Sequence, residues 1–280
     1  MLFIDDEADN ASVNTSKPDL DPTKTNGLIR EILALFRKSC YVGYTATPFA
    51  NIFINPAAYD DRTREDLFPR DFIYCLDAPN NYFGAETIFL EDDGEAKHIR
   101  KIGDAEDILP LKHKKDIALT DLPKSLKQAI QTFLLTRAIR NVRGQRLKHC
   151  SMLINVSRFV DVQKNVRVLV HSYLETLRNA IRANYALPGS ISVKNAYIAS
   201  LKDLFDVEHF NGPESWEEVR AELDNAIGSI KTLVVNSSKS DEPLDYAAYS
   251  MRGEALNAIA VGGLSLSRGL TIEGLTVWSH

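Results

Sequence analysis

A short acidic string follows the first apolar segment of the chain. Residues 2–4 are apolar, and Asp6-Glu7-Ala8-Asp9 comes directly after them and Asp5. An apolar strand that ends in acids places carboxylates at the carboxyl edge of a parallel sheet, where open α/β folds bind ligands. In phosphoryl-transfer enzymes such a strand end supplies one acid that holds Mg²⁺ and another that orients the attacking water. The string therefore holds candidates for a Mg²⁺ ligand and for a neighbouring carboxylate that orients water. An acidic cap on a following turn is the alternative.

A second polar string, Thr45-Ala46-Thr47, stands at the end of the next apolar segment and is followed by Pro48. Small hydroxyl side chains at a strand end can hydrogen-bond an acidic string on the neighbouring strand and so report whether a γ-phosphate is present. A simple strand exit, in which Thr and Pro end the strand, is the alternative. The order and spacing of the two strings are more specific than either string alone.

A third stretch, residues 260–275, is rich in Gly, Ser and Arg. It holds Gly262, Gly263, Ser267, Arg268, Gly269 and Thr271. Glycines let a backbone approach a partner closely, and Ser, Arg and Thr contact phosphates of a nucleic acid or a nucleotide. A glycine-rich turn between two buried strands is the alternative.

The elements that position the first two strings form a strand-helix-strand unit. Apolar patterning predicts strands at 1–4 and 40–45 and a helix at 27–39 between them. Such a unit belongs to a buried parallel sheet. Residues 1–54 are the expected first domain, of α/β class.

Residues 55–121 change in character, with several prolines, many acids and only short apolar runs. The apolar runs include 72–76 and 87–90, and we expect an irregular connector that carries a few strands. This segment is the predicted domain boundary.

Residues 122–280 alternate between helical and strand patterns, which predicts a second parallel sheet with a helical insertion at about 178–230. The predicted helices are 124–142, 160–180, 193–205 and 216–230, and the predicted strands are 151–156, 232–235, 258–261 and 275–278.

Composition limits the partners of the chain. The net charge of −5 gives no global attraction to nucleic acid, so only a local basic patch could bind phosphates. The run from Arg137 to His149 is such a patch, although a solvated helix face is the more common role of such a run. No apolar run reaches the roughly 20 residues of a membrane span, so a cytoplasmic protein is expected. Cys40, Cys75 and Cys150 lack metal-ligand spacing and are expected to be reduced thiols in the core.

The three motifs, in this order, resemble motifs II, III and V of superfamily 2 helicases. More narrowly, four strings resemble the Z1 domain family, which is associated with endonucleases. They are Leu67-Phe68-Pro69-Arg70-Asp71-Phe72-Ile73, Asn81-Tyr82-Phe83-Gly84-Ala85-Glu86, Ser151-Met152-Leu153-Ile154-Asn155-Val156-Ser157 and the string from Val261 to Thr271. The last of these is the most specific.

The resemblance implies two RecA-like lobes of the P-loop NTPase type, of which this chain holds part of the first and most of the second. It implies an ATP hydrolase that acts on DNA in a bacterial restriction or phage-defence system, with ATP and Mg²⁺ as cofactors and a separate nuclease subunit as a partner. By resemblance, Asp6 holds Mg²⁺, Glu7 positions water, and Thr45 to Thr47 couple the nucleotide to the DNA strand. Ser157 and Arg158 begin the fourth motif, and Ser267, Arg268, Gly269 and Thr271 form the fifth.

Two parts of the family pattern are missing. The sequence has no Gly-x-x-x-x-Gly-Lys-Ser/Thr loop to cradle the phosphates, and no Gly-Arg motif follows Leu275. We therefore expect the chain to be a fragment that is inactive by itself. Two alternatives stay open: a non-catalytic DNA-binding or scaffolding module that recruits a nuclease, and an autonomous acidic α/β domain with no nucleotide role.

Overall fold

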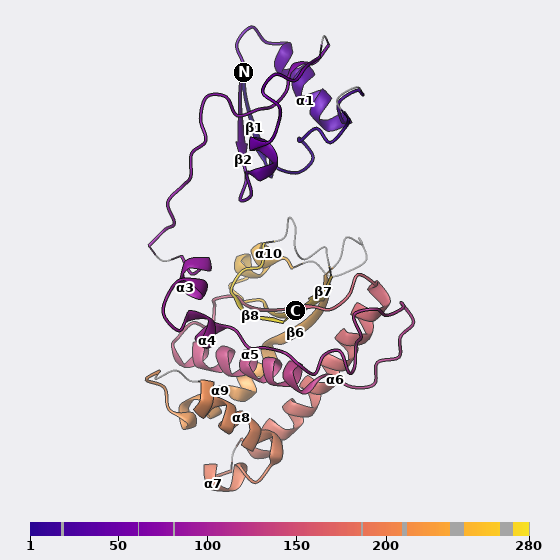
Figure 1. The fold of residues 1–280 in the computed structure, drawn as a ribbon. Coiled ribbons are helices and arrows are strands. Elements are labelled where there is room, and N and C mark those ends of the chain that lie inside the picture. The colour runs from indigo at the N-terminus through magenta and orange to yellow at the C-terminus, as the bar shows by residue number, and fades with distance from the viewer. Residues whose placement is uncertain are drawn as a thin grey trace. The chain divides into compact units, whose positions relative to one another are not determined.

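The structure is a computed structural model that describes residues 1–17, 20–60, 62–80, 82–185, 187–208, 212–235, 244–263 and 271–279. The chain forms two compact units, residues 1–94 and 95–280 (Figure 1). Each unit contains helices and a parallel sheet, so the predicted α/β class is confirmed. The RecA-like assignment stays a prediction.

The first unit is organised around two parallel strands. Strand β1 (Leu2–Asp6) pairs with β2 (Cys40–Tyr44) in a register that aligns Ile4 with Val42. Helix α1 connects them and spans Lys24–Ala34, nearer the N-terminus than the predicted range 27–39. Its last turn tightens, because the backbone N–H groups of the next two residues bond to carbonyls three positions back.

Polar side chains fasten α1 to its surroundings. Asn26 donates to the carbonyl of Ser12 at 2.8 Å and to the carboxylate of Asp66 at 2.9 Å. One turn later, Arg30 donates to the carbonyl of Thr63 at 3.3 Å. Both Asn26 and Arg30 are buried, so hydrogen bonds hold this face of the helix where apolar packing would be usual.

The segment after β2 differs from its predicted detail. Its strands are β3 (Tyr59–Asp60) and β4 (Arg64–Glu65), a short antiparallel pair. The apolar run 72–76 has no regular structure, and the apolar run 87–90 lies largely in helix α3 (Ala85–Phe89). Backbone bonds from Ile88 and Leu90 to residues four positions back close this helix. Along the chain, the short helix α2 (Phe49–Ile52) precedes this segment and the short helix α4 (Gly94–His98) follows it.

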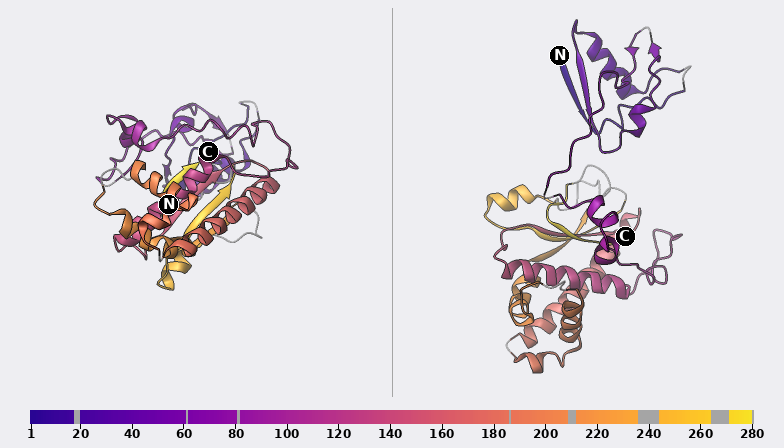
Figure 2. Two further views of the ribbon diagram at one scale, coloured as in Figure 1. Left: turned by 90° about the horizontal axis from the view of Figure 1, so that it is seen from below. Right: turned by 60° about the vertical axis from the view of Figure 1, so that its left-hand side comes forward.

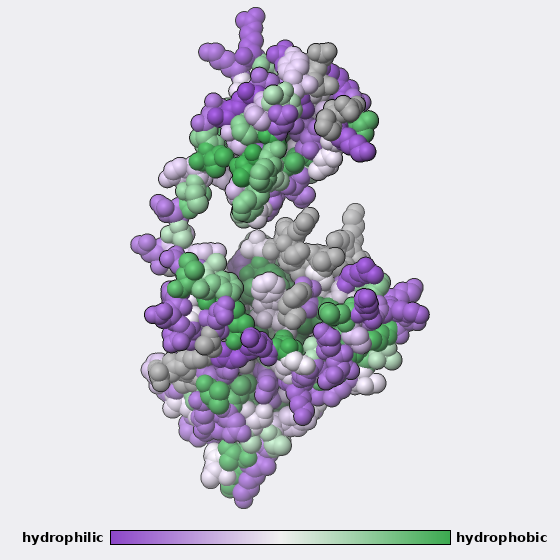
Figure 3. Space-filling model, in the orientation of Figure 1, coloured by the Kyte–Doolittle hydropathy of each residue, from purple (hydrophilic) through white to green (hydrophobic). Residues whose placement is uncertain are grey.

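The first unit buries few apolar side chains among its described residues. Leu2 and Ile4, which point to one face of the sheet, are 59% and 60% exposed. Hydrophobic atoms accordingly appear at the surface of this unit (Figure 3). Cys40 and Cys75 are also exposed and only Cys150 is buried, so the prediction of three core thiols was wrong for two of them.

The second unit contains a four-stranded parallel sheet in the order β6-β7-β5-β8. Its strands are β5 (Cys150–Asn155), β6 (Ile230–Val235), β7 (Asn257–Gly262) and β8 (Leu275–Ser279). The two central strands are buried along almost their whole length, as expected for a parallel sheet covered on both faces. The four strands predicted here are confirmed with small shifts at their ends.

Helices α5 (Lys124–Val142) and α6 (Val160–Asn184) cover one face of this sheet, and α10 (Tyr246–Met251) covers the other (Figures 1 and 2). The predicted range of α5 is confirmed, whereas α10 was not predicted. Asp245 begins α10 by accepting a bond from the backbone N–H of Ala248 at 2.8 Å.

The main core lies between α5, α6 and the sheet. It contains Ile130, Phe133, Leu134, Met152, Ile154, Val162, Val170, Leu177, Ile259 and Val261, all nearly inaccessible to solvent.

Helices α7 (Gly189–Ser192), α8 (Ala196–Glu208) and α9 (Trp216–Ser229) lie between α6 and β6 in the chain. Arg220 of α9 donates to the carbonyls of Tyr185 and Leu187 near the end of α6, at 3.1 and 3.0 Å.

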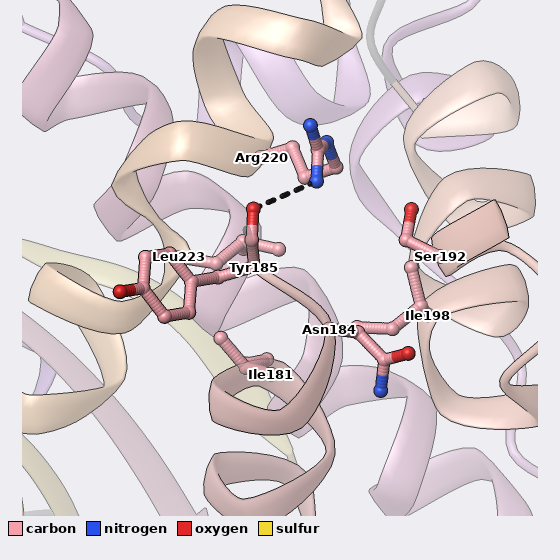
Figure 4. A pocket seen from close by; sticks show the side chains of 7 residues that line it. All are labelled: Ile181, Asn184, Tyr185, Ser192, Ile198, Arg220 and Leu223. Atoms are coloured by element: carbon pink, nitrogen blue, oxygen red, sulfur yellow. Dashed lines mark hydrogen bonds between the residues drawn. The ribbon is translucent and has the colours of Figure 1, made fainter. Parts of the chain in front are cut away.

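A small pocket forms beside Arg220, with room of about 10 Å³, close to the least that holds one water molecule (Figure 4). Its lining residues are Ile181, Asn184, Tyr185, Ser192, Ile198, Arg220 and Leu223. None of the described helices is both long and apolar enough to span a membrane.

Candidate functional site

The acidic string that follows β1 is held against the end of β2. The backbone N–H of Ala8 donates to the carbonyl of Tyr44 at 3.0 Å, and the Ala8 side chain is buried. A Cβ on Gly43 would lie 2.7 Å from the Cβ of Ala8, so the glycine makes room for this contact. Glu7 has a φ of 59°, in the left-handed region that non-glycine residues seldom occupy. The chain thus turns sharply at Glu7 and exposes its carboxylate.

The threonine string bonds to the last acid of the acidic string. The hydroxyl of Thr45 donates to one carboxylate oxygen of Asp9 at 2.7 Å, and that of Thr47 donates to the other at 2.6 Å. The backbone N–H of Thr47 also donates to the Thr45 hydroxyl at 2.9 Å. Ala46 between them is exposed. Asp9, which the sequence did not single out, is therefore the residue that joins the two motifs. Its place at the end of the string was the available signal.

Asp5 and Asp6 have different surroundings. The hydroxyl of Tyr41 donates to Asp5 at 2.5 Å, and burial, followed by this carboxylate, raises the pKa of Tyr41. Asp6 is exposed, and its carboxylate accepts a bond from the backbone N–H of Glu7 at 3.1 Å. Of these two acids, Asp6 is the more accessible to an ion or ligand.

The residues present fit Mg²⁺ in the way nucleotide sites hold it. In such sites Mg²⁺ takes one or two protein carboxylates and obtains its other oxygens from phosphates and water. Asp6 supplies one exposed carboxylate at a strand end. No group of three His, Cys, Asp or Glu side chains that could hold a metal ion occurs among the described residues.

A second cluster lies at the carboxyl ends of β5 and β7. The backbone N–H of Val156 donates to the carbonyl of Gly262 at 3.0 Å. A Cβ on Gly263 would lie 2.1 Å from the carbonyl oxygen of Ser157, which no side chain permits. The fold thus brings Ser157, Gly262 and Gly263 together from distant parts of the sequence.

Arg158 offers a positive charge beside Ser157. Its side chain is exposed, and its guanidinium carbon lies 4.9 Å from the centroid of the Phe159 ring. Among the described residues, no carboxylate forms an ion pair with it. The guanidinium can therefore bind an anion without first breaking an ion pair with a described carboxylate.

Two residues of this cluster were missed by sequence reasoning. His113 approaches the Ser157 hydroxyl to 2.7 Å through Nε2, and the Gln163 side chain donates to the Ser157 carbonyl at 2.8 Å. Gln163 is buried, and its Oε1 has no hydrogen-bond partner within the part of the chain that the structure describes. His113 comes from a distant loop, so no local pattern could have placed it here.

The rest of the third motif is only partly placed. Ser267, Arg268 and Gly269 lie outside the described residues. Thr271 is exposed, and the adjacent Ile272 packs against Leu153 and Ala260 on the sheet.

The basic run from Arg137 to His149, which begins inside α5, mostly contacts other protein groups. Arg137 is 1% exposed and donates to the carbonyls of Lys148 and Gln145, both at 2.8 Å. Arg143 pairs with Glu214, and Arg146 pairs with Glu222. These contacts favour a structural role for the run over a phosphate-binding one.

The acidic and threonine strings lie in the first unit, and the Ser157 cluster lies in the second. Searches of curated proteins and of solved structures found no match to this chain. Residues 125–278, more than half of the 280, match the Z1 domain, and the matched range includes Ser157, Gln163, Gly262 and Gly263 but not His113. The chain therefore belongs to the Z1 domain family.

Proposed function

We propose that this chain is part of an ATP-dependent DNA translocase of the superfamily 2 helicase type, acting in a restriction or phage-defence system. The observation that carries the proposal is the pair of hydrogen bonds from Thr45 and Thr47 to Asp9. These bonds connect the ends of two parallel strands at the edge where α/β sheets bind ligands. A movement of the acidic string would therefore reach the threonine string directly.

In this proposal the acids have separate roles. Asp6 would hold Mg²⁺, which supplies charge neutralisation on the phosphates when bound. Glu7 would orient the attacking water and accept its proton, because its carboxylate is exposed at a turn with restricted backbone geometry. Thr45, Ala46 and Thr47 would transmit a change in the bound nucleotide to the residues that contact DNA. The phosphate loop would be supplied by polypeptide other than these residues.

The second unit would contact phosphates. Ser157, which is buried, would offer its hydroxyl, and Arg158 offers an exposed cation at the same sheet edge; both are groups that position phosphates. Gly262 and Gly263 would let the backbone come close to the ligand, and Ser267, Arg268, Gly269 and Thr271 would add further contacts. DNA cleavage would come from a nuclease partner, and the protein would act in the cytoplasm.

The test uses the full-length protein that contains this chain. Glu7→Gln should abolish steady-state ATP turnover and leave nucleotide binding nearly intact, because the amide keeps the shape of the side chain and cannot accept the proton. Glu91→Gln, a change of the same type at an exposed position of the first unit, is the matched control. Unchanged turnover in Glu7→Gln would refute the assignment.

A non-catalytic DNA-binding or scaffolding module is the second candidate. The exposed Arg158 favours it, since this side chain can contact DNA phosphates without any nucleotide. DNA affinity that is the same with and without ATP and Mg²⁺ would support this candidate over the translocase.

A further inference from the structure

The hydrogen bonds of His113 define its tautomer. Nδ1 lies 2.7 Å from the carbonyl oxygen of Pro110, which can only accept a bond, so Nδ1 carries a hydrogen. In the neutral ring Nε2 is then an acceptor. Since Nε2 lies 2.7 Å from the hydroxyl oxygen of Ser157, the Ser157 hydroxyl donates its hydrogen to His113.

The Ser157 hydroxyl has little capacity left for a ligand. It has one hydrogen and two lone pairs. The hydrogen goes to His113, and one lone pair accepts the backbone N–H of Phe159 at 3.1 Å. Phosphate oxygens at neutral pH act as acceptors. A phosphate oxygen would therefore need the same hydroxyl hydrogen that Ser157 donates to His113.

We infer that His113 is a positioning residue that withholds the Ser157 hydroxyl from phosphate, and that a phosphate oxygen must displace His113 to bind there. The inference rests on the proposed contact of Ser157 with phosphate. Arg158 attracts the phosphate electrostatically. The hydrogen bond between Ser157 and the phosphate oxygen then forms only when the bond between Ser157 and His113 breaks. The ligand is a phosphate group of either DNA or a nucleotide.

The surroundings of His113 permit such a displacement. It belongs to the segment between α4 and α5, which has no helix or strand, and its ring is only partly buried. The ring meets Phe159 edge-on, with centroids 5.8 Å apart, whereas Arg158 lies over the same aromatic ring. His113 can therefore leave without moving the backbone of Ser157, which Gln163 holds by a separate bond at 2.8 Å.

The test is a double-mutant cycle on the full-length protein at a single, mildly alkaline pH. His113→Phe keeps a ring against Phe159 and removes the acceptor, so it should tighten phosphate binding about three- to tenfold. Ser157→Ala should weaken binding. The double variant should match Ser157→Ala within about twofold, because no hydroxyl is left to release.

Two probes distinguish the sources of phosphate. One is a short fluorescein-labelled single-stranded oligodeoxynucleotide without nucleotide, and the other is a fluorescent ATP derivative with Mg²⁺. The probe that shows the gain identifies the phosphate that Ser157 contacts. His113→Leu serves as a second variant if His113→Phe lowers the thermal unfolding midpoint.

The outcomes separate this inference from the proposed function. Equal affinity in the wild type and both His113 variants, or a gain that persists without the Ser157 hydroxyl, would overturn the role of His113 alone. Failure of every variant to bind either probe would overturn the phosphate contact of Ser157 itself, and the role of His113 with it.

Discussion

The hydroxyl of Thr45 donates to the carboxylate of Asp9 over 2.7 Å, and Thr47 donates to the other oxygen of that carboxylate. If these bonds carry the nucleotide state, the double variant Thr45→Val, Thr47→Val should keep ATP hydrolysis and lose most of its stimulation by DNA. Rates of hydrolysis with and without DNA measure this in the full-length protein. Thr15→Val, an exposed threonine of the same unit, is the control. Normal stimulation in the double variant would contradict the coupling role.

Gly263 leaves no space for a side chain, because its Cβ would lie 2.1 Å from the carbonyl oxygen of Ser157. Gly263→Ala should lower the free energy of unfolding by about 1–3 kcal/mol, since backbone atoms must move. Gly228→Ala is the matched control: nothing lies within 4 Å of its Cβ, and it is inside α9. That variant should be about 0.5–1 kcal/mol more stable than the wild type. Urea unfolding measures both, and equal stability of the two variants would contradict the close approach.

Arg137 connects α5 to the loop before β5 and to β7. Its guanidinium donates to the carbonyls of Gln145 and Lys148 and to the side-chain oxygen of Asn257. Arg137→Ala leaves several of these acceptors without donors and should lower the unfolding free energy by about 3 kcal/mol. Arg146→Ala removes an exposed ion pair and should cost about 1 kcal/mol or less. Equal losses would mean that Arg137 is not structural.

Asp104 stabilises the start of α5. It accepts bonds from the backbone N–H of Ser125 at 3.0 Å and from the Ser125 hydroxyl at 2.5 Å. These bonds lower the pKa of Asp104, with the side-chain bond as the larger cause. The folded pKa is thus below the unfolded one. The stabilisation is therefore present above the unfolded pKa and is lost as pH falls through the folded value.

The matching experiment compares thermal unfolding midpoints of the wild type and Asp104→Asn from neutral pH to about pH 3. The wild type should unfold at the higher temperature near neutrality, and the difference should shrink in acid. Asp107→Asn removes one surface charge nearby and serves as the control. A difference that does not change with pH would exclude the ionised carboxylate as its cause.

Much of the second unit could be predicted because its patterns are local. Helix α5 follows from apolar residues at helical spacing, and β5 and β7 are apolar runs of strand length. Helix α10 was missed because it is only six residues long and is started by one capping residue, Asp245.

The candidate site could be predicted only where it consists of contiguous strings. Asp6, Glu7 and Thr45 stand at strand ends, and strand ends can be found from hydropathy. His113 could not be found, because its contact with Ser157 joins residues 44 positions apart and only the fold brings them together. The structural role of Arg137 could not be predicted either, since burial of a basic side chain depends on acceptors distant in sequence.

The most direct test of the account is the chemical identity of the nucleotide bound to the full-length protein after incubation with radiolabelled ATP and Mg²⁺. The account predicts that the wild type holds and releases ADP, whereas Glu7→Gln retains intact ATP. Formation of ADP by Glu7→Gln at the wild-type rate, or failure of the wild-type protein to bind ATP at all, would contradict it.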